Sequence, residues 1–133
     1  MKRIELGCGA TPREGFDGID IQDFGQNYVG NAPDILKKMK DESVDEIYAS
    51  HFFEHLIQDE IMLTLNQCHR VLKKGSQLWI VVPHKDHKKA YVLDHRTFFT
   101  EFTFSDYFNK PVWKIMELVT NERPDIHFKA IKL

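Results

Sequence analysis

The chain opens with the sequence Arg3-Ile4-Glu5-Leu6-Gly7-Cys8-Gly9 and soon continues with Gly18-Ile19-Asp20-Ile21. We interpret residues 3–6 as a short strand that ends in two glycines, which let a backbone turn sharply and approach a ligand closely. Residues 18–21 predict a second strand with an acid near its end. Because only ten residues separate Gly9 from Asp20, we expect the helix that usually joins two such strands to be missing or reduced to a turn.

The rest of the chain alternates predicted strands and helices. Asp34 is expected to cap a short helix, and Gly75 is expected to end a long one whose apolar residues recur with a helical period. In chain order we predict an edge strand at 28–29, a helix at 35–39, a strand at 44–49, a helix opened by Asp59, a strand at 77–82, a helical turn at 105–108, and a hairpin of strands 113–120 and 126–132. This order predicts one compact α/β domain over 1–133, with a doubly wound, mostly parallel sheet and an antiparallel C-terminal hairpin.

Composition narrows the classes of partner. The chain has 133 residues, of which 42% are hydrophobic and 29% charged, with a net charge of −2. Such a charge gives no global positive field for a large nucleic acid, and no stretch has the length of a membrane span. Cys8 and Cys68 form no CxxC pair, and the N-terminus lacks the apolar run of a signal peptide. We therefore expect a cytoplasmic protein that binds no membrane.

Polar and glycine residues follow several of the predicted strands. In an open α/β sheet, ligands bind beyond the carboxyl ends of the strands. We expect the candidate ligand groups at such ends to be Gly7-Cys8-Gly9, Asp20, Asp34, Ser50-His51 and Pro83-His84. The carboxylate of Asp20 is suited to accept hydrogen bonds from the two ribose hydroxyls of a nucleoside.

These segments resemble a known family. Glu5 to Gly9 resembles the first motif of class I methyltransferases, and Gly18 to Ile21 resembles their second-strand acid. Residues 43–56 are similar to the fourth-strand segment of the small bacterial type, and residues 68–83 to its following turn and fifth strand. The resemblance implies a Rossmann-like sheet and methyl transfer from S-adenosylmethionine. The chain departs from the family at Thr11, where a third glycine is usual, and in its shortened first helix.

The resemblance also implies a role for each matching residue. The loop around the methionine part of the cofactor would be shaped by Glu5, Gly7 and Gly9, with Cys8 as the small residue of the tight turn. Further along, Asp20 would hold the ribose, Ile21 would pack on the adenine, Asp34 and Ile35 would lie beside the adenine amine, and Ser50 and His51 would border the sulfonium and the substrate. His84 and His95 lie in the polar stretch after the fifth strand, where either can act as a base or orient a substrate.

Other functions remain open from the sequence alone. The run from His51 to His55 matches H-x-x-E-H, a spacing found in zinc proteases, with Glu54 as the acid. Because His51 is predicted to end a strand, its imidazole and that of His55 need not converge, so we expect no metal and keep a zinc hydrolase as a remote alternative. A second alternative is a cofactor-binding or scaffold protein without catalysis. The methyl acceptor is not identified, with a small molecule favoured, and a neighbouring subunit in a homo-oligomer can replace the missing helix.

Overall fold

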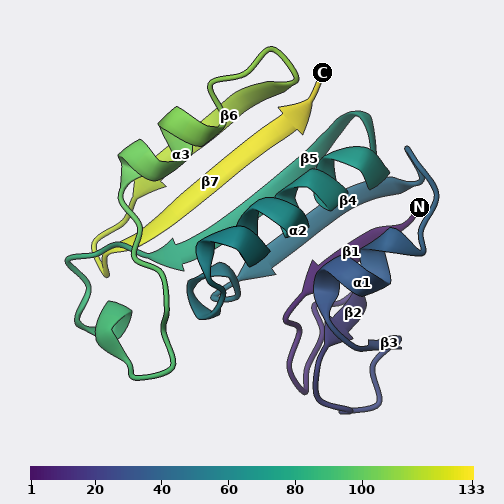
Figure 1. Cartoon of the computed structure of the whole chain (residues 1–133), viewed down its shortest axis with the longest axis horizontal. Coiled ribbons are helices and arrows are strands. Elements are labelled where there is room, and N and C mark those ends of the chain that lie inside the picture. The colour runs from purple at the N-terminus through teal and green to yellow at the C-terminus, as the bar shows by residue number, and fades with distance from the viewer.

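Seven strands form a single sheet in the computed structural model, which describes residues 1–133 (Figure 1). The strands are β1 (Arg3–Leu6), β2 (Asp17–Asp20), β3 (Tyr28–Val29), β4 (Val44–Ser50), β5 (Leu72–Pro83), β6 (Trp113–Thr120) and β7 (Asp125–Lys132). The helices are α1 (Ala32–Lys37), α2 (Gln58–Val71) and α3 (Glu101–Tyr107), with two 3₁₀ turns, η1 (Phe53–His55) and η2 (Lys88–Tyr91). No helix is both long enough and apolar enough to cross a bilayer.

The sheet has the order β3-β2-β1-β4-β5-β7-β6. Its first five strands pair in parallel, whereas β7 runs antiparallel to both β5 and β6. This confirms the predicted α/β sheet with its antiparallel C-terminal hairpin. Because β1 lies between β2 and β4, the chain reverses its direction of travel across the sheet there, and ligands bind at such a switch point.

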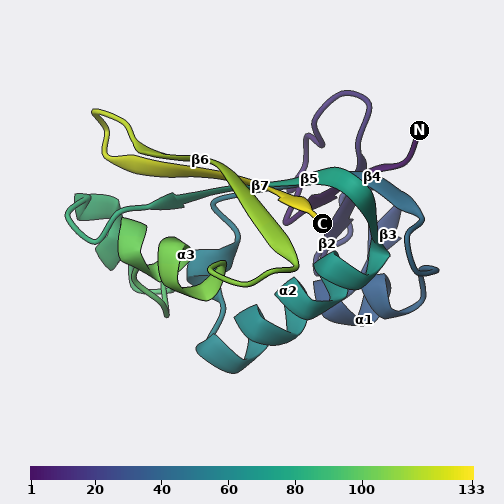
Figure 2. The ribbon, with the colours of Figure 1, turned by 90° about the horizontal axis from the view of Figure 1, so that it is seen from above.

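The three helices lie on one face of the sheet, and the second helical layer of a doubly wound fold is absent (Figure 2). The predicted loss of the first helix is confirmed, since residues 7–16 join β1 to β2 without one. This loop lies over the opposite face of the sheet (Figure 2). The Arg13 guanidinium sits 4.8 Å from the Tyr48 ring centre and 5.1 Å from that of Trp79. Cation–π contacts from a loop thus cover part of the face that a helix would bury.

The hydrophobic core lies between the sheet and the three helices. Leu65, Cys68 and Val71 are buried on one side of α2, as their helical spacing predicts. At the other end of the sheet, the ring of Phe128 packs between Phe104, at a centroid distance of 4.9 Å, and Phe108, at 4.4 Å.

Three predicted helix boundaries were wrong. Helix α1 begins after Asn31 rather than Asp34, with Pro33 in its first turn, where a missing N–H costs nothing. Helix α2 ends at Val71 rather than Gly75, because Leu72 already pairs with Val44 of β4. Helix α3 begins at Glu101, four residues earlier than predicted, behind a capping box formed by the residues at 100 and 103.

Phe128→Ala tests the aromatic part of the core. The side chain is fully buried between two rings, so its truncation leaves a cavity, and we expect the free energy of unfolding to fall by about 3–5 kcal/mol. Urea denaturation followed by circular dichroism measures this. Val119→Ala is the control, since this β6 side chain is 52% exposed and its loss is expected to change stability by no more than about 0.5 kcal/mol. Equal losses in the two variants would contradict this location of the core.

Candidate functional site

A cavity of about 400 Å³ lies at the carboxyl ends of β1, β2 and β4. Predicted residues contribute Gly7 from the end of β1, Asp20 and Ile21 from the end of β2, and His51 from the end of β4. Its remaining lining residues are Ile19, Gly30, Asn31, Ala32, Phe52, His55, Leu56, Glu60 and Arg96. The strand-end rule therefore locates this cavity.

The glycine loop after β1 forms one wall. Gly7 adopts φ of +65°, and a Cβ there would lie 2.6 Å from the Phe52 side chain, so only glycine fits. The N–H groups of Gly7 and Cys8 both donate to the carbonyl of Ile19, at 2.9 and 3.2 Å. The loop is thus anchored to β2 through its backbone.

Asp20 holds this loop and borders the cavity. Its Oδ2 accepts a hydrogen bond from the Gly9 N–H at 3.0 Å, and its Oδ1 accepts one from the Gln22 N–H at 3.0 Å. A carboxylate offers about four acceptor positions. Each oxygen therefore keeps acceptor capacity for a ligand hydroxyl.

An adjoining hollow of about 180 Å³ extends the cavity beside α1 and α2. Ile21 is 73% exposed on its wall, and Asp34 and Leu63 also line it. Ile35 does not, because its side chain packs beside Gly30. Exposed apolar surface next to a carboxylate suits a flat ring with a polar edge.

Several residues predicted to contact the cofactor do not line these cavities. Glu5 is buried and accepts a hydrogen bond from the Arg13 N–H at 2.6 Å, and burial raises its pKa. The Cys8 thiol donates to the Gly9 carbonyl at 3.3 Å, and burial raises its pKa, which keeps the thiol protonated. Ser50 is likewise absent from the walls. These residues shape the surroundings of the cavity rather than its surface.

A second cavity, of about 270 Å³, opens beside the first. Most of its lining residues are polar or charged, and the two cavities share His51 and His55. Its other walls come from Glu54, Pro83, His87, Lys89, Val92, His95, Arg123 and Asp125. Among these residues, His51 and His95 were predicted to border or orient a substrate.

His51 stands where the two cavities meet. Its φ of +53° lies in the left-handed region, which is uncommon for a residue with a side chain and is found preferentially at functional sites. Its Nδ1 lies 3.1 Å from Oε2 of Glu54, a side chain only 1% exposed. This hydrogen bond raises the pKa of His51.

The segment after η2 is fastened to η1 by its backbone. The N–H groups of Arg96 and Thr97 both donate to the Glu54 carbonyl, at 2.8 and 3.2 Å. The preceding residue, His95, is thereby held against His55, with ring centres 4.7 Å apart. Two stretches distant in sequence thus form one wall.

Of the two histidines predicted after the fifth strand, only His95 lines a cavity. His84 lies outside both cavities. Its Nε2 is 3.0 Å from Oε1 of Glu101, and its Nδ1 accepts a hydrogen bond from the Asp86 N–H at 3.1 Å. With both ring nitrogens engaged, His84 joins the β5 end to α3.

The H-x-x-E-H run does not form the helix of a zinc protease. His51 precedes η1, which spans only three residues. The left-handed backbone at His51 separates it from the helical face that carries His55. The two imidazoles therefore do not share one helix, as expected from the predicted strand end at His51.

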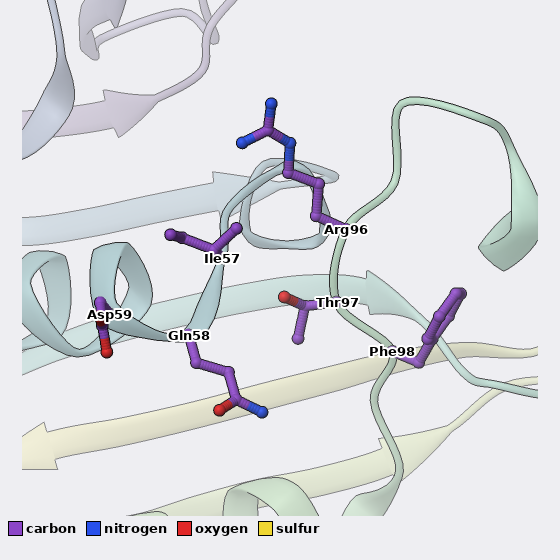
Figure 3. Close-up of a pocket in the computed structure, with 6 residues that line it drawn as sticks. All are labelled: Ile57, Gln58, Asp59, Arg96, Thr97 and Phe98. Carbon is purple, nitrogen blue, oxygen red and sulfur yellow. The ribbon is translucent and has the colours of Figure 1, made fainter.

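A third hollow, of about 540 Å³, lies between the start of α2 and residues 96–98 (Figure 3). Asp59 and Arg96 are its only ionisable residues. Figure 3 shows Arg96 and Phe98 pointing to different sides of their segment. Its walls therefore bring no set of polar groups together.

The sequence did not predict several of the residues that line the first and second cavities. They follow β4 or come from loops whose contacts span tens of residues, although Glu54 and His55 were visible in the H-x-x-E-H run. The missed residues are Gly30, Asn31, Ala32, Phe52, Leu56, Glu60 and Arg96 in the first cavity and Glu54, His55, His87, Lys89, Arg123 and Asp125 in the second.

Comparison with known proteins finds one similar family model and several similar solved structures. A family model described as a methyltransferase domain matches residues 18–80. A SAM-dependent methyltransferase from Archaeoglobus fulgidus is similar over 98% of this chain and 86% of its own, with a TM-score of 0.77 and 19% identity. One from Methanosarcina mazei is similar over 99% and 92%, with a TM-score of 0.74 and 18% identity.

A third structure was solved with ligands. It is the 1,6-didemethyltoxoflavin-N1-methyltransferase of Burkholderia thailandensis with bound 1,6-didemethyltoxoflavin and S-adenosylhomocysteine. It is similar over 98% of this chain and 70% of its own, with a TM-score of 0.72 and 15% identity. No curated protein matches the chain by sequence. Residues 18–80 of this chain thus resemble a methyltransferase domain in sequence, and the whole chain shares its fold with solved SAM-dependent methyltransferases.

Proposed function

We propose that the protein transfers a methyl group from S-adenosylmethionine to a small molecule. The observation that carries this proposal is the contact between two cavities of different character. The larger one holds the glycine loop and Asp20, and the smaller one is polar. They meet at His51 and His55, so two ligands can lie next to each other there.

The larger cavity fits the cofactor. The open acceptor positions of Asp20 suit the two ribose hydroxyls, and Gly7, which lines the cavity, can lie beside the methionine part. Ile21 offers its exposed apolar side chain to the adenine, and Asp34 borders the same hollow, where its carboxylate can accept from the adenine amine. We assign Gly7, Asp20, Ile21, Asp34 and His51 to the cofactor.

The reaction places its main demand on alignment. When bound, the cofactor supplies an activated methyl group on a positively charged sulfur. Displacement at carbon needs the acceptor in line with that methyl group, and holding two reactants in this geometry provides most of the rate. His51, fixed by its hydrogen bond to Glu54, lies at the junction and orients the groups that meet there.

The smaller cavity favours a small polar acceptor. Its volume of about 270 Å³ is just below the usual range for small-molecule sites. Four histidines, Lys89 and Arg123 supply hydrogen-bond donors, whereas Glu54 and Asp125 supply acceptors. The toxoflavin-type neighbour, which was solved with a small-molecule ligand, supports this class of acceptor. The free thiols of Cys8 and Cys68 fit the reducing cytoplasm, where we place the protein.

Asp20→Ala tests the cofactor site. We expect binding of S-adenosylhomocysteine, measured by calorimetric titration, to weaken at least about 100-fold, because two hydroxyl acceptors are lost. The matched control is Asp23→Ala, since Asp23 also accepts a loop N–H, from Gly25 at 2.9 Å, but lines no cavity. Circular dichroism verifies that both variants fold. Unchanged binding in folded Asp20→Ala would contradict the ribose assignment.

A labelled methyl group tests catalysis and the acceptor class together. The protein is incubated with radiolabelled S-adenosylmethionine and a cell extract separated into small molecules, protein and nucleic acid. We expect label in the small-molecule fraction, and none with Asp20→Ala. Label confined to a macromolecular fraction would contradict the acceptor class. Absence of label from every fraction, with cofactor binding intact, would favour a cofactor-binding protein without catalysis.

A further inference from the structure

We propose that Glu54, His55 and His95 form a binding site for a divalent transition-metal ion in the second cavity. Each side chain offers one ligand atom, and these atoms lie within 4.8 Å of one another. All three residues line the same cavity. The hydrogen bonds of the Glu54 carbonyl to residues 96 and 97 hold the segment that carries His95 against η1.

The buried carboxylate of Glu54 is only half satisfied. Its Oε2 contacts His51, but its Oε1 is buried without a hydrogen-bond partner. An unpaired buried carboxylate oxygen is costly, so such groups are normally paired or bind a metal. Asp125, 6% exposed, lines the same cavity and also has a buried oxygen, Oδ1, without a hydrogen-bond partner. Two residues that line the cavity together with the two histidines thus each carry a buried carboxylate oxygen without a hydrogen-bond partner.

In both histidines, Nδ1 has an oxygen acceptor nearby, and Nε2 is available to bind a metal ion. The Nδ1 of His95 lies 3.2 Å from the Ala90 carbonyl, and the Nδ1 of His55 lies 3.5 Å from Oδ2 of Asp94. Both partners are acceptors, so they favour the proton on Nδ1 and leave the Nε2 lone pair free. Metal-binding histidines are typically oriented in this way by a carbonyl or a carboxylate.

The donor set selects the class of ion. Imidazole nitrogens suit zinc, iron, nickel and copper rather than magnesium or calcium, which prefer oxygen ligands. Two histidines and one carboxylate also leave coordination positions open, as in catalytic zinc and non-haem iron sites. An ion here would face the cavity assigned to the acceptor. Its use in orienting an acceptor rests on the proposed function, whereas the site itself stands on these contacts alone.

Metal titration of the full chain tests the site. The protein is stripped with a chelator and titrated calorimetrically with Zn²⁺, without any cofactor, and Co²⁺ absorption reports the ligand geometry. We expect one ion per chain. His55→Ala and His95→Ala, both partly exposed positions, are expected to fold normally and to weaken zinc binding at least about tenfold, in line with the losses that even indirect metal contacts produce.

His127→Ala is the matched control. This histidine lies on β7, with its ring centre 6.4 Å from that of Trp79, and lines neither cavity. Zinc binding should be unchanged in it. The site would be overturned by wild-type protein that binds no zinc at micromolar concentration, by unchanged binding in His95→Ala, or by an equal loss in His127→Ala. Titration of metal-free protein with S-adenosylhomocysteine tests the cofactor site separately, so either proposal can fail alone.

Discussion

The short connection between β1 and β2 sets the form of the whole molecule. Residues 7–16 cannot hold a crossover helix of the usual length, so all helices lie on one face and a single core forms there (Figure 2). The opposite face of the sheet, which carries no helix, is covered by long charged side chains that remain partly in contact with water. The Arg13 guanidinium lies against the Tyr48 and Trp79 rings, and the Lys129 ammonium lies 4.5 Å from the centre of the Trp79 ring. Stability therefore depends on one layer of buried contacts, with its aromatic end around Phe128.

The same short connection changes what holds the glycine loop. In a fold with a first helix, the loop continues into the helix N-terminus, whose N–H groups fix its shape. In this chain Asp20 accepts the Gly9 N–H, and the Ile19 carbonyl accepts two more loop N–H groups. The loop is thus fixed from β2, and Asp20 at the cavity edge has this structural role in addition to the recognition role that we propose for it.

Local sequence patterns predicted which helices and strands form better than they predicted the residues at which these begin and end. Strands β1 and β6 begin and end where the sequence predicts. The C-terminal end of α2 was missed because pairing of Leu72 with Val44, a contact across 28 residues, outweighs the helix-stop signal of Gly75. In the candidate site, too, long-range contacts decide what the local sequence could not predict. The strand-end rule found Gly7 and Asp20, but sequence could not separate His84 from His95, because hydrogen bonds to the distant Glu54 decide which of them reaches a cavity.

Glu54 connects the two cavities mechanically. Its carboxylate fixes His51, which both cavities share, and its carbonyl accepts from the backbone of Arg96, a residue that lines the larger of these two cavities. His95, the neighbouring residue, borders the other cavity. A ligand in either cavity therefore touches a segment held by the same residue. One buried residue thus anchors walls of both cavities.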